Sequence, residues 1–527
     1  MKKMKLLAMM AVLAAVICIV VIYGSPYAAL VQPVMEIEEI WAIEDAREES
    51  DEPLVTMLEN RGVPLAYDAQ SNTFYCTLGL ENGDEWPDVH LHALDAGGVK
   101  LAFVDDYTYD WCADAIRDGY PYQVMAYTDE EFWYFDLVFT GLPIVMIDAK
   151  EELRAHEDVP AELAVSWDGK TALRSHVRTH KRGDTTLRMS EKYGIKVEFT
   201  RNANGTQKIS QEVPGLGMTD EFILIGFAFE PQLLRDRLSW EVWNRITRED
   251  EPFGPRQTQY AEVFVNGEYQ GVYLMMKPYN YVQELGKDSA AAAQTDSVYR
   301  TAGDHVYEFD RPLAQDYRHA YYEAHHGPLG RPEFEALQPY LEMIAQEDDE
   351  VFCEMALELL DMDSVIRYCL FIEAGCMMDN EKNNLYIWAH RENGRPKYRF
   401  ATWDMDNSWG RQGGIENTDV WIGFPLFDRL LRLDCGGFFC KRTFEIWQEM
   451  RALALNDAFI SEVLDEYVHQ LGDSGAYARE ADRWGRDEIE PDASNVYTFA
   501  MEHFQSLDRV FEELTDPQLR RNYYGAE

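Results

Sequence analysis

Residues 379–410, DNEKNNLYIWAHRENGRPKYRFATWDMDNSWG, contain a hairpin signal between two polar segments. The dipeptide Asn393-Gly394 is the strongest short-range signal for a tight β-turn, and apolar runs flank it on both sides. We therefore predict a strand over 385–389 and a returning strand over 397–403. A helical pattern ends just before the polar loop 379–384, so this loop joins a helix to the hairpin.

Pairing across this turn predicts a metal site. A hairpin centred on the turn places Asn384 opposite Trp403, and Asp404 and Asp406 follow directly. Facing residues of an antiparallel pair have Cα atoms about 4.5–5.5 Å apart, so an amide oxygen and one or two carboxylates can share one hard cation. Mg2+ prefers such oxygen ligands and takes others from water and substrate phosphates. We predict Asn384, Asp404 and Asp406 as ligands of Mg2+ or Mn2+.

Asp379 lies five residues before Asn384, at the start of the polar loop. In protein kinases an aspartate accepts the proton of the substrate hydroxyl, an asparagine five residues on binds metal, and a hairpin leads to a metal-binding aspartate. The His-Arg-Asp and Asp-Phe-Gly sequences of those enzymes are absent here. The spacing alone is common in long chains, and an exposed loop without a catalytic role is the alternative. Together with the hairpin and the terminal Trp-Asp-x-Asp, the spacing favours phosphoryl transfer.

The motifs along the central part of the chain resemble the CotH spore-coat kinase family. That family has an Asp-to-Asn loop before a tyrosine-containing strand, then a Trp-Asp-x-Asp-x-x-x-Gly segment. Upstream it has an Arg-Gly turn with hydroxyl residues, a lysine before a strand, a Leu-Arg-Asp helix opening and a hairpin. The matching segments, in the family's order, are 182–186, 192–195, 234–236, 262–273, 379–386 and 403–410, within a region of resemblance from about 160 to 410.

The resemblance implies an atypical protein-kinase-like fold that transfers phosphate from ATP to serine or threonine hydroxyls of a protein substrate. It implies that Asp379 is the general base and that Lys192 reaches the nucleotide phosphates. Lys382 would contact the transferring phosphate. The residues implied to line the phosphates are Arg182, Gly183, Thr185 and Thr186, and the implied metal ligands are again Asn384, Asp404 and Asp406.

Two departures from the family pattern keep a second interpretation open. Asp184 places a carboxylate in the turn where phosphates would lie, which is costly unless a metal or a lysine intervenes. Lys277 ends the second hairpin where the family often has glutamate. The alternative is a catalytically inactive, kinase-like protein that binds partners or mediates adhesion at the cell surface.

Shifts in composition predict an α+β protein with five segments. A signal anchor or transmembrane segment precedes an acidic, amphipathic spacer, and a small all-β, sandwich-like accessory domain follows. The atypical kinase-like core and its helical C-terminal part occupy the rest. The expected bounds, in chain order, are 1–30, 31–52, 53–155, 160–415 and 416–527.

The N-terminus predicts export. Three lysines within the first five residues precede an uncharged run over 6–23, which as a helix would reach about 27 Å, close to the thickness of a bilayer core. We favour an uncleaved anchor, and a cleaved signal peptide is the alternative. In both cases the remainder would be extracellular, either on a single-pass membrane anchor or secreted.

Charge restricts the partners. With 94 acidic and 48 basic residues the chain has a formal net charge of −46, which disfavours nucleic acids and requires any phosphate site to be a small pocket. The expected partners are a nucleotide, a protein substrate and, through the N-terminal helix, a membrane. The eight cysteines have no zinc-site spacing, and Cys369 and Cys376 fall in an apolar helical pattern typical of a core.

Overall fold

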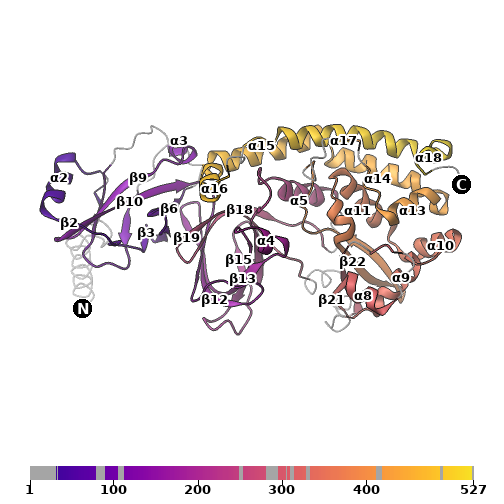
Figure 1. Cartoon of the computed structure of the whole chain (residues 1–527), viewed down its shortest axis with the longest axis horizontal. Helices are drawn as coiled ribbons and strands as arrows, with labels where there is room; N and C mark the ends of the chain where they lie inside the picture. The colour runs from indigo at the N-terminus through magenta and orange to yellow at the C-terminus, as the bar shows by residue number, and fades with distance from the viewer. Residues whose placement is uncertain are drawn as a thin grey trace, which may run out of the picture. The chain divides into compact units, whose positions relative to one another are not determined.

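The computed structural model describes residues 31–32, 34–78, 89–104, 112–247, 253–280, 295–303, 306–308, 314–327, 333–410, 418–419, 421–486 and 491–524. The predicted anchor over 1–30 lies outside these residues, and within them no helix is both long and apolar enough to span a membrane. The chain combines helices and strands in an α+β structure (Figure 1). It divides into two compact units. The first comprises Met1–Ala228, Gln259–Met276 and His469–Pro491, and the second comprises Phe229–Thr258, Lys277–Val468 and Asp492–Glu527.

The N-terminal part of the first unit is built on two β-sheets. Its strands are β1 (Val31–Gln32), β2 (Glu48–Glu49), β3 (Leu58–Asn60), β4 (Val63–Pro64), β5 (Ala66–Asp68), β6 (Thr73–Thr77), β7 (Leu91–Ala93), β8 (Lys100–Phe103), β9 (Tyr122–Tyr127) and β10 (Glu131–Thr140). The larger sheet has the order β1-β8-β9-β10-β6-β5 with β2 on β10, and the smaller has the order β4-β3-β7. One apolar core joins side chains of both sheets.

Two helices belong to this N-terminal part, and one of them lies within the region 53–155 that was predicted as an all-β, sandwich-like domain. α2 (Ile37–Ala46) lies within the predicted spacer, and its buried Ile40 and Ile43 pack with Met125 and Phe132 of the larger sheet. α3 (Cys112–Arg117) contributes to the core shared by the two sheets. The helix expected in the spacer is thus present, but only part of its apolar residues is buried: Ile37 and Trp41 are 53% and 55% exposed.

A closed β-barrel forms the rest of the first unit. Its strands are β11 (Ile144–Ala149), β12 (Val159–Trp167), β13 (Lys170–Arg182), β14 (Gly194–Thr200), β17 (Glu221–Ile225), β18 (Thr258–Val265) and β19 (Glu268–Met276), in the order β11-β12-β13-β14-β17-β19-β18. β11 lies before the expected boundary at 155, yet it closes the barrel by pairing with β12 and, in parallel, with β18. Alternate side chains fill the interior, among them Val197, Phe199 and Val263. The smaller elements are α4 (Thr185–Met189), β15 (Gln211–Val213), β16 (Gly217–Thr219) and α16 (Ala476–Trp484).

The second unit combines a four-stranded sheet with helices. The sheet has the order β21-β20-β22-β23, formed by β20 (Ser297–Ala302), β21 (Tyr322–His326), β22 (Asn383–Glu392) and β23 (Arg395–Ala401). The predicted hairpin register is confirmed from Tyr386↔Ala401 to Glu392↔Arg395. The remaining helices among the described residues are α5 (Arg235–Ile246), α8 (Gln315–Tyr321), η3 (Glu335–Leu337), α9 (Gln338–Ile344), α10 (Asp349–Leu359), α11 (Met362–Ala374), α12 (Met378–Lys382), α13 (Pro425–Leu433), η5 (Cys435–Gly437), α14 (Phe439–Leu453), α15 (Asp457–Asp473), α17 (Ser494–Glu513) and α18 (Pro517–Tyr524).

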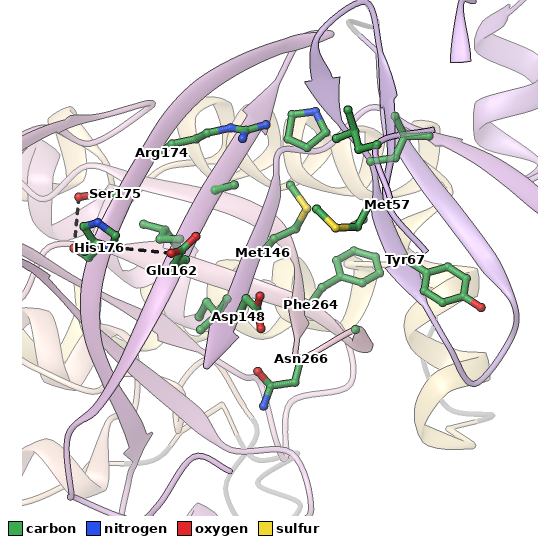
Figure 2. A pocket seen from close by; sticks show the side chains of 18 of the residues that line it. Met57, Tyr67, Met146, Asp148, Glu162, Arg174, Ser175, His176, Phe264 and Asn266 are labelled. Atoms are coloured by element: carbon green, nitrogen blue, oxygen red, sulfur yellow. Dashed lines mark hydrogen bonds and ion pairs between the residues drawn. The ribbon is translucent and has the colours of Figure 1, made fainter. Parts of the chain in front are cut away.

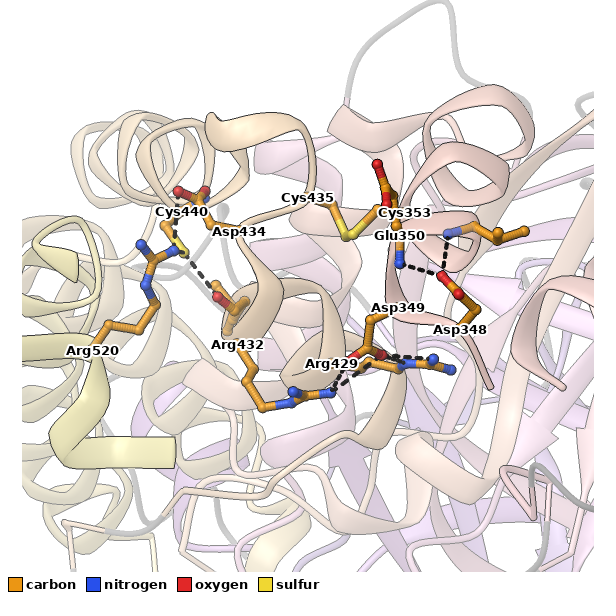
Figure 3. Close-up of a disulfide and its surroundings, with 12 residues drawn as sticks. Asp348, Asp349, Glu350, Cys353, Arg429, Arg432, Asp434, Cys435, Cys440 and Arg520 are labelled. Atoms are coloured by element: carbon orange, nitrogen blue, oxygen red, sulfur yellow. Dashed lines mark hydrogen bonds and ion pairs between the residues drawn. A yellow bond between two sulfur atoms is a disulfide. The ribbon is translucent and has the colours of Figure 1, made fainter. Parts of the chain in front are cut away.

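A disulfide ties two helical elements of the second unit together. Cys353 on α10 is bonded to Cys435 on η5, 82 residues later (Figure 3). Beside this bond, Asp349 at the start of α10 pairs with Arg429 at 2.8 Å and with Arg432 at 3.2 Å, both on α13. The covalent link and the ion pairs hold the start of α10 against the C-terminal helices.

Candidate active site

The predicted catalytic loop is a short helix that fixes Asp379. α12 follows α11 directly, and Asp379 lies half-buried in its first turn. One carboxylate oxygen accepts from Asn383 Nδ2 at 2.8 Å and the other accepts from Asn384 Nδ2 at 3.0 Å. Because the Asn384 amide nitrogen donates to Asp379, its carbonyl oxygen remains the atom able to bind a cation. The predicted pair Asp379 and Asn384 is thus in direct contact.

Asn380 joins this loop to the segment that contains the predicted metal ligands. It is fully buried, and its Nδ2 donates to Thr402 Oγ1 at 3.2 Å and to the Trp403 carbonyl at 2.7 Å. From the other side, the Tyr368 hydroxyl donates to the Asn380 carbonyl at 2.6 Å. The loop and the end of β23 are therefore held together by a buried amide that sequence analysis did not single out.

The two principal predicted metal ligands share an uncommon backbone conformation. Asn384 has φ 58° and Asp404 has φ 56°, both in the left-handed region. Asparagine and aspartate tolerate this region better than other non-glycine residues, and such conformations persist where the surrounding structure enforces them. Asn384 is the second residue of β22, and Asp404 lies three residues after the end of β23. The backbone strain therefore lies at the two ends of this hairpin that are farthest from its turn.

A third carboxylate, Asp236 on α5, lies beside the predicted metal ligands. In the 404–406 segment Asp404 is exposed, Asp406 is half-buried and Met405 is fully buried between them. Asp236 is fully buried, and its Oδ1 accepts from the Met405 amide at 3.3 Å. Burial, followed by the charges of Asp404 and Asp406, raises the pKa of Asp236 well above its usual value. The Leu-Arg-Asp opening of α5 was recognised in the sequence without a role for this aspartate.

The donor atoms present suit a hard divalent cation. Among the described residues, no group of three or more His, Cys, Asp or Glu side chains is placed so that it could hold a metal ion. An amide oxygen of Asn384 and carboxylates of Asp404 and Asp406 would supply part of a coordination shell, as is usual for Mg2+ at nucleotide sites. Asp236 Oδ2 is buried without a hydrogen-bond partner, and a nearby cation would compensate its charge.

Lys192 forms a buried ion pair in the first unit. Its side chain is fully enclosed, and Nζ donates to Glu480 Oε1 at 2.5 Å and to the Val272 carbonyl at 2.8 Å. The other carboxylate oxygen of Glu480 accepts from the Val272 amide at 2.7 Å. Burial lowers the pKa of Lys192 to about 8, and Glu480 opposes this shift. The ammonium group is therefore held against β19 and would reach a phosphate only after its surroundings open.

The Arg182–Thr186 turn connects β13 to α4 and contains the other predicted phosphate ligands. Gly183 has φ +113°, and a Cβ there would lie 2.0 Å from Thr186 Oγ1, so only glycine fits. Arg182 is half-buried beside it, and Thr185 is exposed. Arg188 pairs with Asp184 at 2.9 Å, so the carboxylate that departs from the family pattern has a cationic partner one helical turn away.

Glu480 was missed by sequence reasoning because it lies 288 residues from Lys192. Helix α16 presents it to β19, and neighbouring side chains fix the helix there: Arg479 pairs with Glu262 at 2.7 Å, and Arg483 pairs with Glu268 at 2.7 Å. One signal in the sequence could have indicated this helix as a contact surface. Its residues three to four positions apart, which lie on one face, are charged or aromatic: Arg479, Glu480, Arg483 and Trp484. A lysine–glutamate pair of this kind is a component of protein-kinase sites.

The Asp379–Asn384 contact, the hairpin that ends in two aspartates and the lysine–glutamate pair on the barrel together define a kinase-like protein. The family model described as CotH kinase protein matches residues 179–510, which is more than half of the chain. The chain therefore belongs to the CotH kinase family, and the predicted resemblance is confirmed. No curated protein matches the chain.

A separate cavity of about 750 Å3 lies between the N-terminal sheets and the barrel, all within the first unit (Figure 2). Met57, Tyr67, Met146 and Phe264 form its apolar side. Its polar side is the outer face of the barrel. There Asp148 on β11 pairs with Glu162 on β12, and Glu162 pairs in turn with His176 on β13. None of the predicted site residues lines this cavity.

Proposed function

We propose that the protein is a CotH-type protein kinase that transfers the γ-phosphate of ATP to serine or threonine hydroxyls of surface or coat proteins. The observation that carries this proposal is the Asp379 network, in which both carboxylate oxygens are held by Asn383 and Asn384. This contact fixes the general base relative to a metal ligand. A loop without a catalytic role would have no need for such a constraint.

The proposed reaction is a single in-line displacement. The acceptor hydroxyl oxygen bonds to the γ-phosphorus as the bond from that phosphorus to the β–γ bridging oxygen breaks, and ADP leaves. The hydroxyl proton passes to Asp379. A bound Mg2+ or Mn2+ would neutralise charge on the phosphate oxygens, and Asn384, Asp404 and Asp406 would hold it.

Most of the proposed phosphate contacts belong to the first unit. The Arg182–Thr186 turn offers the Arg182 guanidinium, the backbone at Gly183 and the hydroxyls of Thr185 and Thr186. Lys192, which is enclosed against Glu480, would join these contacts once its surroundings open, and Glu480 would then position it as the acidic partner positions the lysine of a kinase. Lys382 on α12 would contact the transferring phosphate.

We also propose that the protein is exported and remains in the cell membrane through its N-terminal segment, or is secreted if that segment is cleaved. The Cys353–Cys435 disulfide supports export, because structural disulfides form and persist in oxidising compartments. Substrates would then be proteins of the cell surface or a coat.

Transfer of labelled phosphate tests the proposed activity. Purified protein is incubated with Mg2+ or Mn2+, γ-labelled ATP and a serine-rich polypeptide. We expect label on the polypeptide, and a loss of at least about 100-fold in Asp379→Ala and in Asp404→Ala. Glu466→Gln, an exposed change on α15, is the control and should retain full activity. Equal activity of the control and both site variants would contradict the proposal.

The cavity in Figure 2 favours one second candidate, a cell-surface binding protein. Met57 is 55% exposed and Leu94 is 45% exposed on its lining, so apolar surface is available to a partner. Calorimetry separates the candidates. Absence of any ATP or ADP binding by the wild-type protein would favour the binding role, and micromolar nucleotide binding lost in Asp404→Ala would favour the kinase.

A further inference from the structure

Buried hydrogen bonds and an ion pair fix the N-terminus of α5, next to the residue that contacts the segment of predicted metal ligands. Glu230 is fully buried, and its two carboxylate oxygens accept from the Leu234 amide at 2.6 Å and from Arg235 Nη1 at 2.6 Å. Arg235 is itself buried against Glu230. The position of Asp236, the next residue, is therefore set by a buried anion in the segment before α5 and a buried cation at the first residue of the helix.

Two side chains of α5, nearly one helical turn apart, form hydrogen bonds with the segment that follows β23. Asp236 accepts from the Met405 amide, which lies between the two predicted aspartate ligands. Ser239 Oγ accepts from Trp409 Nε1 at 2.9 Å and lies 3.3 Å from Ser408 Oγ. Ser408 in turn donates to the Met405 carbonyl at 2.7 Å. The contact at Ser239 is neutral, whereas the contact at Asp236 brings a third carboxyl group to the segment.

We propose that Asp236 is a positioning residue for the cation site: its Oδ1 fixes the Met405 amide between Asp404 and Asp406, and its Oδ2 supplies a third negative charge when the cation is bound. This inference rests on the proposed function, because it needs a cation at Asp404. It assigns Asp236 no direct bond to substrate or nucleotide.

The burial of Asp236 supports this role more than a purely structural one. Its Oδ2 is buried with no hydrogen-bond partner, although an amide side chain could make the same bond to Met405 without an unpaired oxygen of this charge. A buried carboxyl group beside two further acids costs folding free energy unless a cation offsets it. An acid at this position is therefore explained by the cation that the exposed Asp404 would bind.

Titration of Mn2+ into the nucleotide-free protein tests the inference, with Asp236→Asn as the variant. The amide retains an oxygen acceptor for Met405 but lacks the charge. We expect the Mn2+ dissociation constant of the site to rise about tenfold or more, as is common when partners of metal ligands are changed. The melting temperature of the metal-free variant should equal or exceed that of the wild type, so the stabilisation by Mn2+ shrinks.

Three further variants make the result specific. Asp404→Asn defines the site, because the Mn2+ binding that it removes is the binding under study. Glu373→Gln is the matched control, another buried acid changed to an amide, and should leave Mn2+ affinity unchanged. Ser239→Ala loosens the neutral contact without removing charge and should weaken Mn2+ binding less than Asp236→Asn.

The outcomes separate this inference from the proposed function. If wild type and Asp404→Asn bind Mn2+ equally, the proposed metal site itself fails. If Asp404→Asn loses binding while Asp236→Asn retains wild-type affinity, only the role of Asp236 is overturned. Equal losses in Asp236→Asn and Ser239→Ala, with lowered metal-free melting temperatures in both, would also overturn it, because Asp236 would then act through packing alone.

Discussion

At the scale of single residues, Glu373 is a carboxyl group of α11 that is fully buried without a cationic partner. Its Oε2 accepts from the Ile422 amide at 3.1 Å, and its Oε1 has no hydrogen-bond partner. Burial raises its pKa from 4.5 to about 8, and the acids Asp428 and Glu381 raise it further, against the Ile422 hydrogen bond. The folded protein therefore holds a proton here at neutral pH that the unfolded chain releases.

We predict that Glu373→Gln becomes increasingly stabilising, relative to the wild type, as pH rises from about 5 to 8. Over this interval folding takes up the Glu373 proton, so wild-type stability falls with pH by up to about 1.4 kcal/mol per unit for this group. Below the pKa of Glu373 in the unfolded chain, the stability that its proton contributes is fully present. Above about pH 8 this contribution is lost, and the difference in stability between the two proteins levels off.

Urea unfolding of both proteins at pH 5 to 9 measures this difference. Glu350→Gln, an exposed change at the start of α10, is the control and should give a curve parallel to that of the wild type. A constant difference between Glu373→Gln and wild type across the whole range would refute the assignment of the proton to Glu373.

The site residues that sequence could predict are those whose partners are close along the chain. Asp379 contacts Asn383 and Asn384, four and five residues on, so local spacing contained the information. Asp236 meets Met405 across 169 residues, and Lys192 meets Glu480 across 288. No periodicity or motif spacing specifies such contacts, because they depend on how the units fold.

At the scale of elements, α16 shows how one helix depends on a single glycine of the barrel. Gly271 on β19 has φ +89°, and a Cβ there would lie 2.0 Å from Glu480 Oε2 and 3.0 Å from Trp484 Nε1. A side chain at this position would push α16 from the strand and separate Glu480 from Lys192. The close approach therefore explains why an otherwise strand-disfavouring residue lies in this hairpin.

We predict that Gly271→Ala lowers the free energy of unfolding by at least about 2 kcal/mol, because strain and overpacking add. Gly62→Ala separates the two causes: Gly62 has φ +83° in the same unit, but no atom lies within 4 Å of an added Cβ. Denaturant unfolding of both variants gives the comparison. Equal losses in the two would show that backbone strain alone acts and that α16 tolerates the added methyl group.

The elements that sequence predicted well have strong local signals. The Asn393-Gly394 turn fixed the register of β22 and β23. The polar loop after Asp379 is instead the helix α12, whose five residues are too few for a periodic pattern. β20 lies between β21 and β22 with Val298 and Tyr299 buried, and no strand was predicted there from the sequence. Its Val, Tyr and Thr residues favour a strand, but a segment of six residues becomes identifiable only through its pairing with β21 and β22.

At the scale of the whole molecule, the two units differ in their covalent constraints. Among the described residues, the disulfide links α10 and η5 within the second unit, and the described cysteines of the first unit, Cys76 and Cys112, are free and buried. A closed loop of this length stabilises by about 4.5 kcal/mol in the chain-entropy model.

We predict that the double variant Cys353→Ala, Cys435→Ala lowers the melting temperature of the second unit and leaves that of the first unchanged. Scanning calorimetry measures both, and Gly271→Ala identifies the transition of the first unit. Reductant should shift the wild type in the same direction and leave the double variant unaffected. A common shift of both transitions would mean that the units unfold as one cooperative structure.

The Lys192–Glu480 pair also determines when the first unit can finish folding during synthesis. Since the partners are 288 residues apart, a ribosome that adds about 5–20 residues per second completes Lys192 roughly 15–60 s before Glu480. Once β19 has been made, and until α16 follows, the nascent barrel has an ammonium group without its counter-ion and a β19 surface without its covering helix. The first unit therefore reaches its final form only near the end of translation, and a chain that stops before α16 leaves a barrel suited to capture by chaperones or proteases.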